Sequence, residues 1–598
     1  MRSKKLFGFL LLCIVFQFSY AQTSMINVYG RNSELLNGKW ETIIDPLDAG
    51  IGWRAVYKDA TPTGKNDFVE YSFIKENTLN VPGDYNSQLP ELTYYESSVW
   101  YKKTFNYAPN KNERLFIHFG AVNYIADVYF NGKKLGRHEG GFTPFQFEIT
   151  DLVKESGNAL IVRVNNSRIK NGIPGFGFDW FNYGGITRDV HLIKTKKVFI
   201  EDYKIQLDPD DKNHITGYAK LNSELANQKI SIEIPELKIN EKIVTDNKGF
   251  ATISLKKKLQ LWTPEQPKLY NASLSIENDS ISDRIGFRTI KVDGTQILLN
   301  GKPVFLRGVN IHEEIPQKKA RAYSDADAQV LINWAKELGC NFVRLVHYPH
   351  NEYTIKQAEE KGLMVWEEIP VYQGIDFPDS TVKGKAALML KEVIKRDKNR
   401  CNVILWSVAN ETGPSKERDK TLIALAKEAK LLDPTRLVTA AFNNVSYHDY
   451  KMELKDSVMK YVDVIGINEY MGWYTDWPKD PEKVEWVSNF NKPMIMSEFG
   501  GESVYNNRID TAVKASAWSE DYVVNIYNNQ IKMFKKIPFL QGVCPWVLVD
   551  FRSPVRMQST YQKGWNRKGL LSDQGEKKKS WYTMKAYYDQ LKKMNGIQ

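Results

Sequence analysis

The sequence predicts a multidomain β and α/β chain in which two all-β domains precede an α/β barrel. Short runs that alternate apolar and polar residues fill the chain from about residue 25 to 195, and similar runs fill 196–290. After residue 295, eight apolar runs alternate with helix-like segments. We therefore expect three domains, at 22–195, 196–290 and 291–598.

The length of the chain agrees with this division. At 598 residues and 42% hydrophobic, it is too long for one ordinary core, and about three domains of usual size would account for it. Residues 1–21 are typical of a signal peptide, with a basic start, an apolar run at 6–18 and a small-residue pattern that ends at Ala21. Because that run is shorter than the ~20 residues that span a bilayer, cleavage is favoured over a retained anchor. We expect an exported protein, periplasmic or extracellular, with no membrane span in the mature chain.

The charge and the cysteines narrow the possible partners. The formal net charge is +11 and becomes +8 when the three basic residues of the leader (Arg2, Lys4 and Lys5) are removed. The basic residues are scattered, without a compact run interleaved with aromatics, so no nucleic-acid partner is expected, whereas an acidic substrate is compatible. Three cysteines of the mature chain lie in apolar contexts and are expected to be buried free thiols: Cys340, Cys401 and Cys544.

The first two domains show the period-two alternation of half-buried strands. Runs such as "SSVWYKKTFNY" and "RLFIHFGAV" are broken by turn residues, and Asn131-Gly132 is a strong hairpin signal, which favours an antiparallel sandwich. The second domain has runs such as "ISIEIPEL" and "YNASLSIEN", and its length suits an immunoglobulin-like sandwich.

The last domain has the pattern of a TIM (β/α)8 barrel. Its eight candidate strands are "PVFLRGVN", "NFVRLVH", "LMVWEEI", "NVILWSVAN", "RLVTAAF", "YVDVIGI", "PMIMSEF" and "FLQGVCPWVL". Near-continuous apolar runs fit strands that are buried on both faces. Helix-like segments lie between most of them, for example 325–339, which Ser324 precedes as an expected N-cap. Eight β/α repeats in roughly 250 residues is the count typical of this fold.

Two glutamates stand at the ends of predicted barrel strands. The fourth strand runs into Asn410 and Glu411, and the seventh presents Glu498. Because the carboxyl ends of barrel strands build the active site, both carboxylates should face one cleft, although a structural ion pair is the alternative for Glu411 taken alone. Two such carboxylates are what cleavage of a glycosidic bond requires, one as a proton donor and the other as a nucleophile or base.

A metal site is the alternative use of paired carboxylates. His312 and His347 are the nitrogen ligands that it would recruit, but such a site would want more ligands than the strand ends supply. We expect no metal and no cofactor.

The chain resembles glycoside hydrolase family 2, which includes β-galactosidases and β-glucuronidases, over nearly all of its mature length. The matching motifs, in order, are "GAVNYIADVYFNGKKLGRHEGGFTPF", "FDWFNYGGITRDV", "RGVNIHEE", "VRLVHYPH", "WSVANE", "INEYMGWY", "SEFG" and "GVCPWVLVDF". The resemblance implies a jelly-roll sugar-binding domain, an immunoglobulin-like domain and a catalytic TIM barrel.

The resemblance also implies roles for the residues at the barrel mouth. Glu411 would be the general acid/base and Glu498 the nucleophile of a retaining double displacement, with carboxylates about 5 to 5.5 Å apart. Tyr470 would hold Glu498 in line, and Asn410 would bond the sugar hydroxyl on C2. Three further residues match positions that line the sugar subsite in the family, with barrel-top packing as the alternative for each: His312, His347 and Trp546.

The segment "GWNRKGLLSD" bears on the choice of sugar. Asn566 and Lys568 resemble the Asn-x-Lys signature by which β-glucuronidases of the family hold the carboxylate on C6, and an ammonium with an amide donor suits that group. Asp179 matches an aspartate that reaches the sugar hydroxyls from the sandwich, and Tyr474 matches a tyrosine near the carboxylate end.

One feature departs from the β-glucuronidase pattern. Tyr561 and Gln562 stand where an arginine shortly precedes the signature, so Arg556 or Arg567 would have to replace that cation, and the configuration at C4 stays open.

We therefore expect a retaining, exo-acting β-glycoside hydrolase that removes terminal β-linked glucuronic acid from glycans or glucuronides. A β-galacturonidase or β-galactosidase of the same family is the enzymatic alternative. A glycan-binding protein without catalysis is the remaining one, and the presence of both glutamates speaks against it. The expected partner is a uronic-acid-containing carbohydrate, and homo-oligomerisation is left open.

Overall fold

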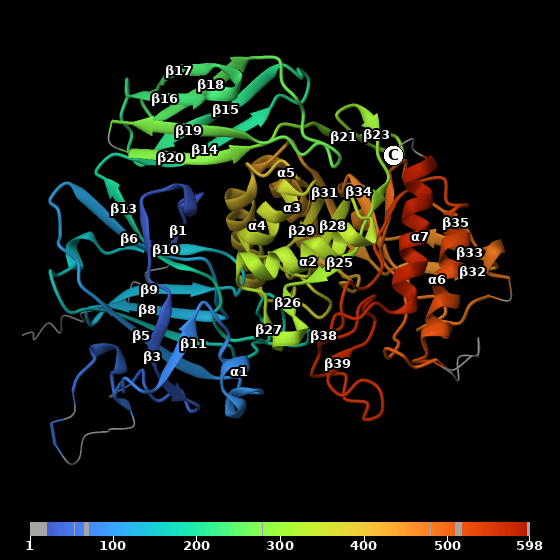
Figure 1. Cartoon of the computed structure of the whole chain (residues 1–598), viewed down its shortest axis with the longest axis horizontal. Helices are drawn as coiled ribbons and strands as arrows, with labels where there is room; N and C mark the ends of the chain where they lie inside the picture. Colours follow the sequence, from blue (N-terminus) through green and yellow to red (C-terminus); the bar gives the residue numbers. More distant parts are fainter. Residues whose placement is uncertain are drawn as a thin grey trace, which may run out of the picture.

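The computed structural model of the chain describes residues 21–594, except 53, 62, 65–70, 278, 479 and 509–516. The predicted signal peptide lies outside the described residues apart from Ala21. Two β domains and a barrel follow one another along the chain, which confirms the predicted fold class, and the second β domain lies against both of the others (Figure 1). In the described ranges, no helix is long and apolar enough to cross a membrane.

The first domain is a sandwich of two antiparallel sheets. One sheet has the order β1 (Gln22–Thr23), β10 (Phe145–Glu148), β6 (Glu113–Phe119), β13 (Val190–Lys196) and β2 (Ser33–Leu35). The other has the order β4 (Thr78–Val81), β3 (Gly38–Asp45), β5 (Ser98–Phe105), β11 (Asn158–Asn165), β8 (Ile125–Phe130) and β9 (Lys133–Glu139). Alternate side chains such as Trp40, Val128 and Phe145 fill the core between the sheets.

The predicted Asn-Gly turn joins β8 to β9. Asn131 and Gly132 have φ angles of 50° and 79°. Because a two-residue hairpin with both central φ angles positive matches the twist of its strands, this dipeptide fixes the hairpin locally.

The second domain is a smaller antiparallel sandwich. Its sheets have the orders β14 (Ile200–Leu207), β15 (His214–Leu221), β18 (Phe250–Lys256), and β17 (Ile239–Val244), β16 (Lys229–Ile234), β19 (Tyr270–Ile276), β20 (Asp279–Ile285). Isoleucines such as Ile205, Ile232 and Ile253 dominate the core. A small sheet leads into the barrel and consists of β21 (Ile290–Asp293), β22 (Gln296–Leu299) and β23 (Lys302–Pro303).

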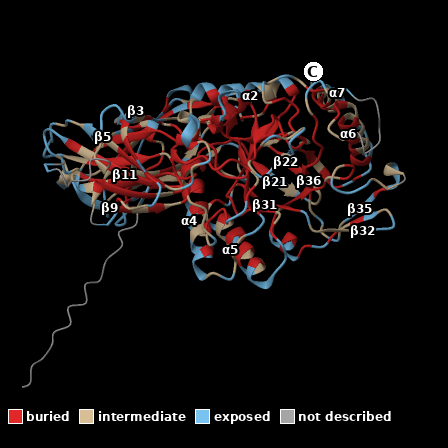
Figure 2. Cartoon of the chain, turned by 90° about the horizontal axis from the view of Figure 1, so that it is seen from below, coloured by how far each residue is buried: buried red, intermediate tan, exposed pale blue. Residues whose placement is uncertain are grey.

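The barrel is a closed parallel sheet of eight strands, counting β24 and β25 as two parts of the first strand. It is closed because β24 pairs with the last strand, β37, while β25 pairs with the second strand, β28. In order around the barrel, its strands are β24 (Leu306–Arg307) with β25 (Asn310–His312) as the first strand, then β28 (Phe342–Val346), β29 (Met364–Glu368), β30 (Val403–Asn410), β31 (Leu437–Phe442), β34 (Val464–Asn468), β36 (Met494–Glu498) and β37 (Leu540–Val543). All eight predicted runs coincide with barrel strands, although β25 continues to His312 and β34 to Asn468, beyond the predicted ends at 310 and 467. Figure 2 shows buried residues in barrel strands such as β31 and β36, as in the strands of the first sandwich, and exposed residues on outer helices such as α2.

Helices cover the outside of the barrel. They are α2 (Asp325–Leu338), α3 (Glu352–Glu360), α4 (Ser380–Asp397), α5 (Lys416–Leu432), α6 (Glu520–Phe534) and α7 (Lys579–Met594). Ser324 caps α2 as predicted, because its side chain accepts from the N–H of Asp327, whose carboxylate accepts from the N–H of Ser324 in return. The helix ends at Gly339, which takes a φ of 100°.

The connections after β31 and β34 build a sheet of their own. It consists of β32 (Val445–His448), β33 (Lys451–Leu454) and β35 (Glu485–Val487). β32 and β33 form a hairpin that stands beside the barrel mouth.

Buried polar contacts connect the first sandwich to the barrel. Arg188 donates to Glu313 at 3.2 Å, and Thr143 donates to Glu392 on α4 at 2.6 Å. Both contacts are buried, and salt therefore screens the Arg188–Glu313 ion pair only weakly. They hold the loop after β11, which carries Asp179, over the carboxyl ends of the barrel strands.

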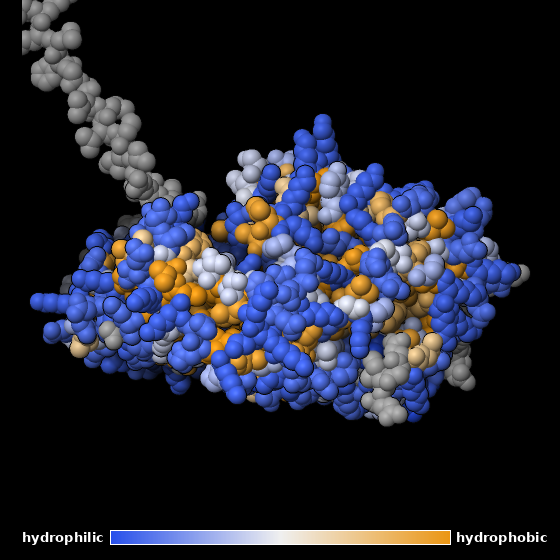
Figure 3. All heavy atoms as spheres, turned by 90° about the horizontal axis from the view of Figure 1, so that it is seen from above, coloured by the Kyte–Doolittle hydropathy of each residue, from blue (hydrophilic) through white to orange (hydrophobic). Residues whose placement is uncertain are grey.

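The three cysteines of the mature chain follow the sequence prediction. Cys340, Cys401 and Cys544 are buried free thiols, as predicted. The face drawn in Figure 3 is mostly hydrophilic, with separate small apolar areas.

Candidate active site

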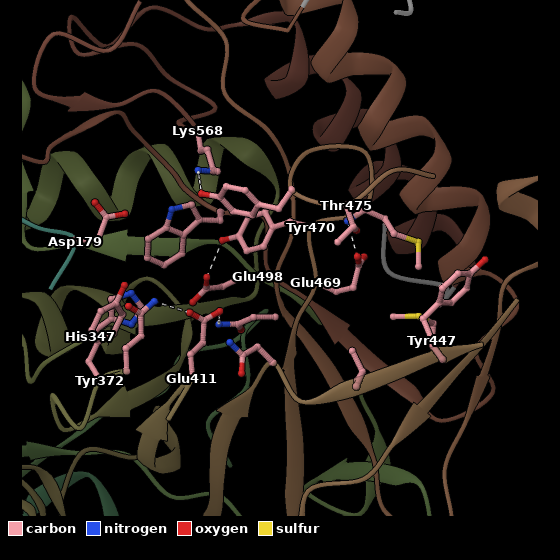
Figure 4. Close-up of a pocket in the computed structure, with 18 of the residues that line it drawn as sticks. Asp179, His347, Tyr372, Glu411, Tyr447, Glu469, Tyr470, Thr475, Glu498 and Lys568 are labelled. Atoms are coloured by element: carbon pink, nitrogen blue, oxygen red, sulfur yellow. Dashed lines mark hydrogen bonds between the residues drawn. The ribbon is translucent and has the colours of Figure 1, made fainter. Parts of the chain in front are cut away.

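A cavity of about 540 Å³ opens at the carboxyl ends of the barrel strands. Eight of the eleven residues singled out in the sequence line it: Asp179, His347, Glu411, Tyr470, Tyr474, Glu498, Trp546 and Lys568. They come from five barrel strands or their loops, from the segment after β39 (Trp565–Asn566) and, for Asp179, from the sandwich. Figure 4 shows Glu411 and Glu498 near its centre, with Asp179 and Lys568 on one side.

Glu411 directly follows β30, and its backbone turns sharply there. Its φ of 51° lies in the left-handed region, which a residue other than glycine adopts only at a cost of roughly 1–3 kcal/mol. The side chain is half-buried, and its carboxylate accepts hydrogen bonds from Gln373 and Asn468, both at 2.9 Å. The turn therefore lifts the carboxylate off the end of a fully buried strand and into the cavity.

Glu498 ends β36 and is only 4% exposed. Its Oε1 accepts from Nη1 of Arg344 at 2.8 Å, and its Oε2 accepts from the hydroxyl of Tyr470 at 2.7 Å. Burial raises the pKa of Glu498, Arg344 opposes this, and the nearby charge of Glu411 adds to it. The two carboxylates are thus close enough to influence each other across the cavity.

Arg344 stands at the centre of a buried network beneath the cavity. Besides Glu498, it donates to Glu368 at 3.1 Å and to the amide oxygen of Asn410 at 2.7 Å. Arg344 and Glu368 are both fully buried. Although Glu368 is buried, the charge of Arg344 holds its pKa below the usual value. A buried cation shared by two carboxylates fixes the position of Glu498 at the bottom of the cavity.

Asn410 and Asn468 lie between the two glutamates. Oδ1 of Asn410 accepts from Arg344 and from Asn468, the latter at 3.1 Å. Its amide Nδ2 is buried and has no partner in the described part of the chain. Asn410 does not itself line the cavity, but it retains a spare donor beside the catalytic candidates.

The aromatic wall consists of His347 and Trp546, with His312 behind it. The rings of His347 and Trp546 stack with centroids 4.9 Å apart, and Nδ1 of His347 contacts Glu368 at 2.9 Å. His312 packs between Trp546 and Phe551 and contacts the hydroxyl of Tyr348 at 3.2 Å. Burial lowers the pKa of His312 well below its usual value. The structure therefore places His312 under the wall rather than in the cavity.

Lys568 closes one end of the cavity. Its side chain is 1% exposed, and Nζ donates to the hydroxyl of Tyr474 at 2.9 Å and to Glu502 at 3.1 Å. The rings of Tyr470, Trp473 and Tyr474 lie within 5.8 Å of this ammonium. An ammonium has three donors, so one remains after these two hydrogen bonds.

Arg556 is the second cation at this end. It forms a paired contact with Asp179, including a 3.0 Å bond from Nε, and it also donates to Glu502 at 2.9 Å. Burial and the pull of Arg556 and Lys568 act in opposite directions on Glu502, and the two cations prevail, so its pKa is lowered. Of the two arginines weighed as replacements for the missing one, Arg556 lines the cavity. Arg567 instead pairs with Asp550 and Asp573.

Asn566 lies behind this cluster. It is fully buried, its Nδ2 donates to Asp179 at 3.4 Å, and its Oδ1 accepts from the backbone N–H of Lys568 at 3.1 Å. Asn566 therefore positions Asp179 and Lys568 rather than lining the cavity.

The ligand set for a metal is not assembled. Among the residues that the structure describes, no group of three histidine, cysteine, aspartate or glutamate side chains could hold an ion. The candidate nitrogens of His312 and His347 contact Tyr348 and Glu368 instead.

Several residues of the site were missed in the sequence. Arg344 and Glu368 carry the same signal as Glu411, a charged residue within an apolar strand ("NFVRLVH" and "LMVWEEI"), and that signal would have found them. Glu502, by contrast, lies in a polar stretch with no distinguishing pattern. It is recognisable only because Lys568 and Arg556 converge on it.

Comparison with known families agrees with this architecture. The model described as "Glycosyl hydrolases family 2, TIM barrel domain" matches residues 290–593. The family's sugar binding domain matches 34–196, and "Glycosyl hydrolases family 2" matches 198–288. The fold and the paired carboxylates belong to a class of enzymes that cleave glycosidic bonds. The chain belongs to glycosyl hydrolase family 2 and is a glycoside hydrolase.

Similar proteins share most of the length of the chain. A "Beta-glucuronidase" of Paenibacillus borealis is 27% identical over 86% of this chain and 91% of its own length. A "Beta-glucuronidase" of Rattus norvegicus is 29% identical over 85% of this chain and 84% of its own. The solved structure of an uncultured Clostridium sp. β-glucuronidase superposes with a TM-score of 0.80 at 26% identity and covers 96% of this chain and 100% of that one.

Proposed function

We propose that this enzyme removes terminal β-linked glucuronic acid from glycans or glucuronides by a retaining double displacement. The observation that carries the proposal is the arrangement of one cavity: two carboxylates, Glu411 and Glu498, at its centre and two cations, Arg556 and Lys568, at one end. The likeness to the β-glucuronidases named above supports the same substrate.

Glu498 is the nucleophile in this proposal. Arg344 and Tyr470 each hold one of its oxygens, so its carboxylate has a fixed direction toward the anomeric carbon. Glu411 donates its proton to the glycosidic oxygen as the bond to the leaving group breaks, and Glu498 forms a glycosyl ester.

The second step releases the sugar. Forming the ester removes the negative charge of Glu498, and Glu411, now ionised, takes a proton from the incoming water. Water attacks the anomeric carbon, and the ester bond to Glu498 breaks, which restores both groups and retains the configuration. The half-buried position of Glu411 gives that water access, whereas Glu498 is enclosed.

The amide of Asn410 has a proposed role beside these steps. Its buried Nδ2 is unpartnered, and a sugar hydroxyl on C2 would satisfy that donor. Because Arg344 and Asn468 both donate hydrogen bonds to Oδ1 of Asn410, the orientation of the amide is fixed.

The carboxylate on C6 is assigned to the cationic end. Lys568 keeps one free donor, and Arg556 stands beside it on the cavity wall. Glu502 and Asp179 already pair with these two cations, so the sugar carboxylate would add a charge-assisted hydrogen bond rather than neutralise an unpaired charge.

The proposal is tested with para-nitrophenyl β-glycosides of glucuronic acid, galacturonic acid and galactose. We expect kcat/KM to be highest on the glucuronide, with the anomeric configuration retained in the first-formed product by NMR. Glu498→Gln should abolish turnover, and azide should restore turnover of Glu411→Gln on this activated substrate with an azido sugar as product. Preference for a galacturonide or galactoside would overturn the assignment of the sugar, and an inverted product would overturn the mechanism.

We also propose that the protein is exported. The leader at 1–21 carries this proposal. Terminal sequencing of the protein from its native host should find Gln22 as the first residue, and a retained Met1 in the cytoplasm would contradict export.

A further inference from the structure

The cavity continues on the far side of the two carboxylates from Lys568. Figure 4 shows Asp179 and Lys568 on one side of Glu411 and Glu498, and Tyr447, Thr475 and Glu469 on the other. This second end is formed by the hairpin of β32 and β33 and by the segment that follows β34. The proposed function uses none of Tyr447, Thr475 and Glu469.

One wall of this end is apolar. Tyr447 on β32 pairs directly with Met452 on β33, and Val445 lies two residues before Tyr447, so all three side chains share one face of the hairpin. That face lines the cavity, and Met471 lines it from the loop after β34. Tyr447 remains 48% exposed, and no other ring in the described chain stacks on it. An open aromatic side chain beside two methionines suits a flat apolar ligand.

Burial raises the pKa of Glu469 to about 7, so the charge at this end is negative above that pH. Glu469 lines it and is buried, with one oxygen accepting from the backbone N–H of Met471 and the other accepting from Gln530 at 3.1 Å. These two bonds leave lone pairs on both oxygens. Within the described chain, the cations that line the cavity are Arg556 and Lys568, and both belong to the opposite end.

The direction of the substrate follows from the proposed function, on which this inference rests. If the C6 carboxylate lies at Lys568 and the anomeric carbon at Glu498, the glycosidic oxygen points away from Lys568. The group beyond that oxygen then enters the end lined by Tyr447 and Glu469.

We propose that the cavity end formed by Val445, Tyr447, Met452, Met471 and Glu469 is the leaving-group subsite, that it takes a flat aromatic or apolar aglycone, and that Glu469 selects against aglycones that carry a negative charge. Sugar residues that carry a sulfate or a uronate carboxylate are therefore poor leaving groups for this enzyme. A neutral or cationic group near Glu469 is favoured, because it can hydrogen-bond to the carboxylate or offset its charge.

The aromatic wall is tested with Tyr447→Ala on two substrates. Phenyl β-glucuronide places a ring in the subsite, whereas β-glucuronyl fluoride has a leaving group of one atom that cannot reach Tyr447. The ratio of kcat/KM for the phenyl substrate to that for the fluoride should fall about threefold to tenfold, the range expected for loss of one aromatic contact. Tyr461→Ala is the matched control, because Tyr461 is equally exposed at 48% and lies outside the cavity. An unchanged ratio in Tyr447→Ala would overturn the assignment of the wall.

The charge selection is tested with phenyl and meta-carboxyphenyl β-glucuronides, whose leaving groups are of nearly equal acidity. At about pH 8, above the pKa of Glu469, wild-type enzyme should prefer the phenyl substrate in kcat/KM by about tenfold, from repulsion at a partly desolvated carboxylate. Glu469→Gln keeps the shape and should reduce that preference to about twofold. Glu453→Gln, on the opposite face of the same hairpin, is the control that should keep the wild-type preference. Equal turnover of both substrates by wild type, or an undiminished preference in Glu469→Gln, refutes the role of Glu469.

The design separates this inference from the proposed sugar specificity. The same two aglycones are also attached to galacturonic acid and galactose. Turnover of another sugar but not of glucuronides would refute the glucuronide assignment, while the ratio of carboxyphenyl to phenyl on that sugar would still decide the role of Glu469.

Discussion

Arg344 donates from Nη1 to Oε1 of Glu498 at 2.8 Å, and the same guanidinium grips Glu368 with its other nitrogens. All three side chains are buried, with Arg344 and Glu368 beneath the cavity and Glu498 lining it. Because removing one member of a buried ion cluster strands the others, the position of Glu498 and the stability of the barrel depend on the same arginine.

Arg344→Met should therefore damage both activity and stability. We expect kcat to fall at least about hundredfold, because Glu498 loses the donor that aligns it. The free energy of unfolding should fall by about 3–5 kcal/mol, because Glu368 and Glu498 are left buried without a cation. Steady-state kinetics and urea denaturation measure the two effects. In the double variant Arg344→Met/Glu368→Gln, stability should largely return while activity does not, and a joint recovery would show that Arg344 acts only on folding.

Tyr470→Phe should shift the pH profile as well as lower the rate. Burial raises the pKa of Glu498, and the hydrogen bond from Tyr470 is one of the contacts that lower it. Without that bond the pKa rises further, so the acidic limb of kcat/KM should move to higher pH, and kcat/KM at the optimum should fall about tenfold to hundredfold. Tyr474→Phe is the contrast, because its hydroxyl contacts Lys568 rather than Glu498, and its acidic limb should stay in place. An unmoved limb in Tyr470→Phe would contradict the proposed role of the hydroxyl.

Lys568→Met should impair uronides far more than neutral glycosides. Loss of one charge-assisted hydrogen bond predicts a fall of about tenfold to hundredfold in kcat/KM for the glucuronide relative to the glucoside. The double variant Lys568→Met/Glu502→Gln separates recognition from folding, because it also removes the buried carboxylate that would lose one of its two cations. The exposed Lys563, five residues away, provides the control Lys563→Met. A uniform loss on charged and neutral sugars would argue against binding of a carboxylate at this end.

Glu314→Gln should change how stability depends on pH. Burial raises the pKa of Glu314 to about 8 in the folded protein, above the usual value that it regains on unfolding. The unfolded chain thus ionises first as pH rises, and wild-type stability declines between about pH 5 and 8 by about 1.4 kcal/mol for each unit of the shift. The variant lacks this slope, so its Tm relative to wild type should rise over that range. Thermal unfolding at several pH values measures it, with the exposed Glu224→Gln as a control whose Tm difference stays constant.

Most of the fold was predictable because it follows from local patterns. A strand buried on both faces has an apolar sequence, so the eight barrel strands from Leu306 to Val543 could be located. Ser324 and Asn131-Gly132 indicated a helix start and a turn, because each acts through contacts within a few residues. Glu411 and Glu498 could be singled out for a related reason, since a carboxylate at the end of such a run is costly to bury unless it is paired or serves a site.

The contacts between distant side chains were decided only in the tertiary structure. Arg556 meets Asp179 although 377 residues separate them, and this pairing exists because the sandwich is docked over the barrel mouth. His312 reads like a residue of the sugar subsite, yet ring packing with Trp546 and Phe551 keeps it behind the wall. The alternation of residues reports which side chains are buried, whereas barrel closure and domain docking determine which buried charges become neighbours.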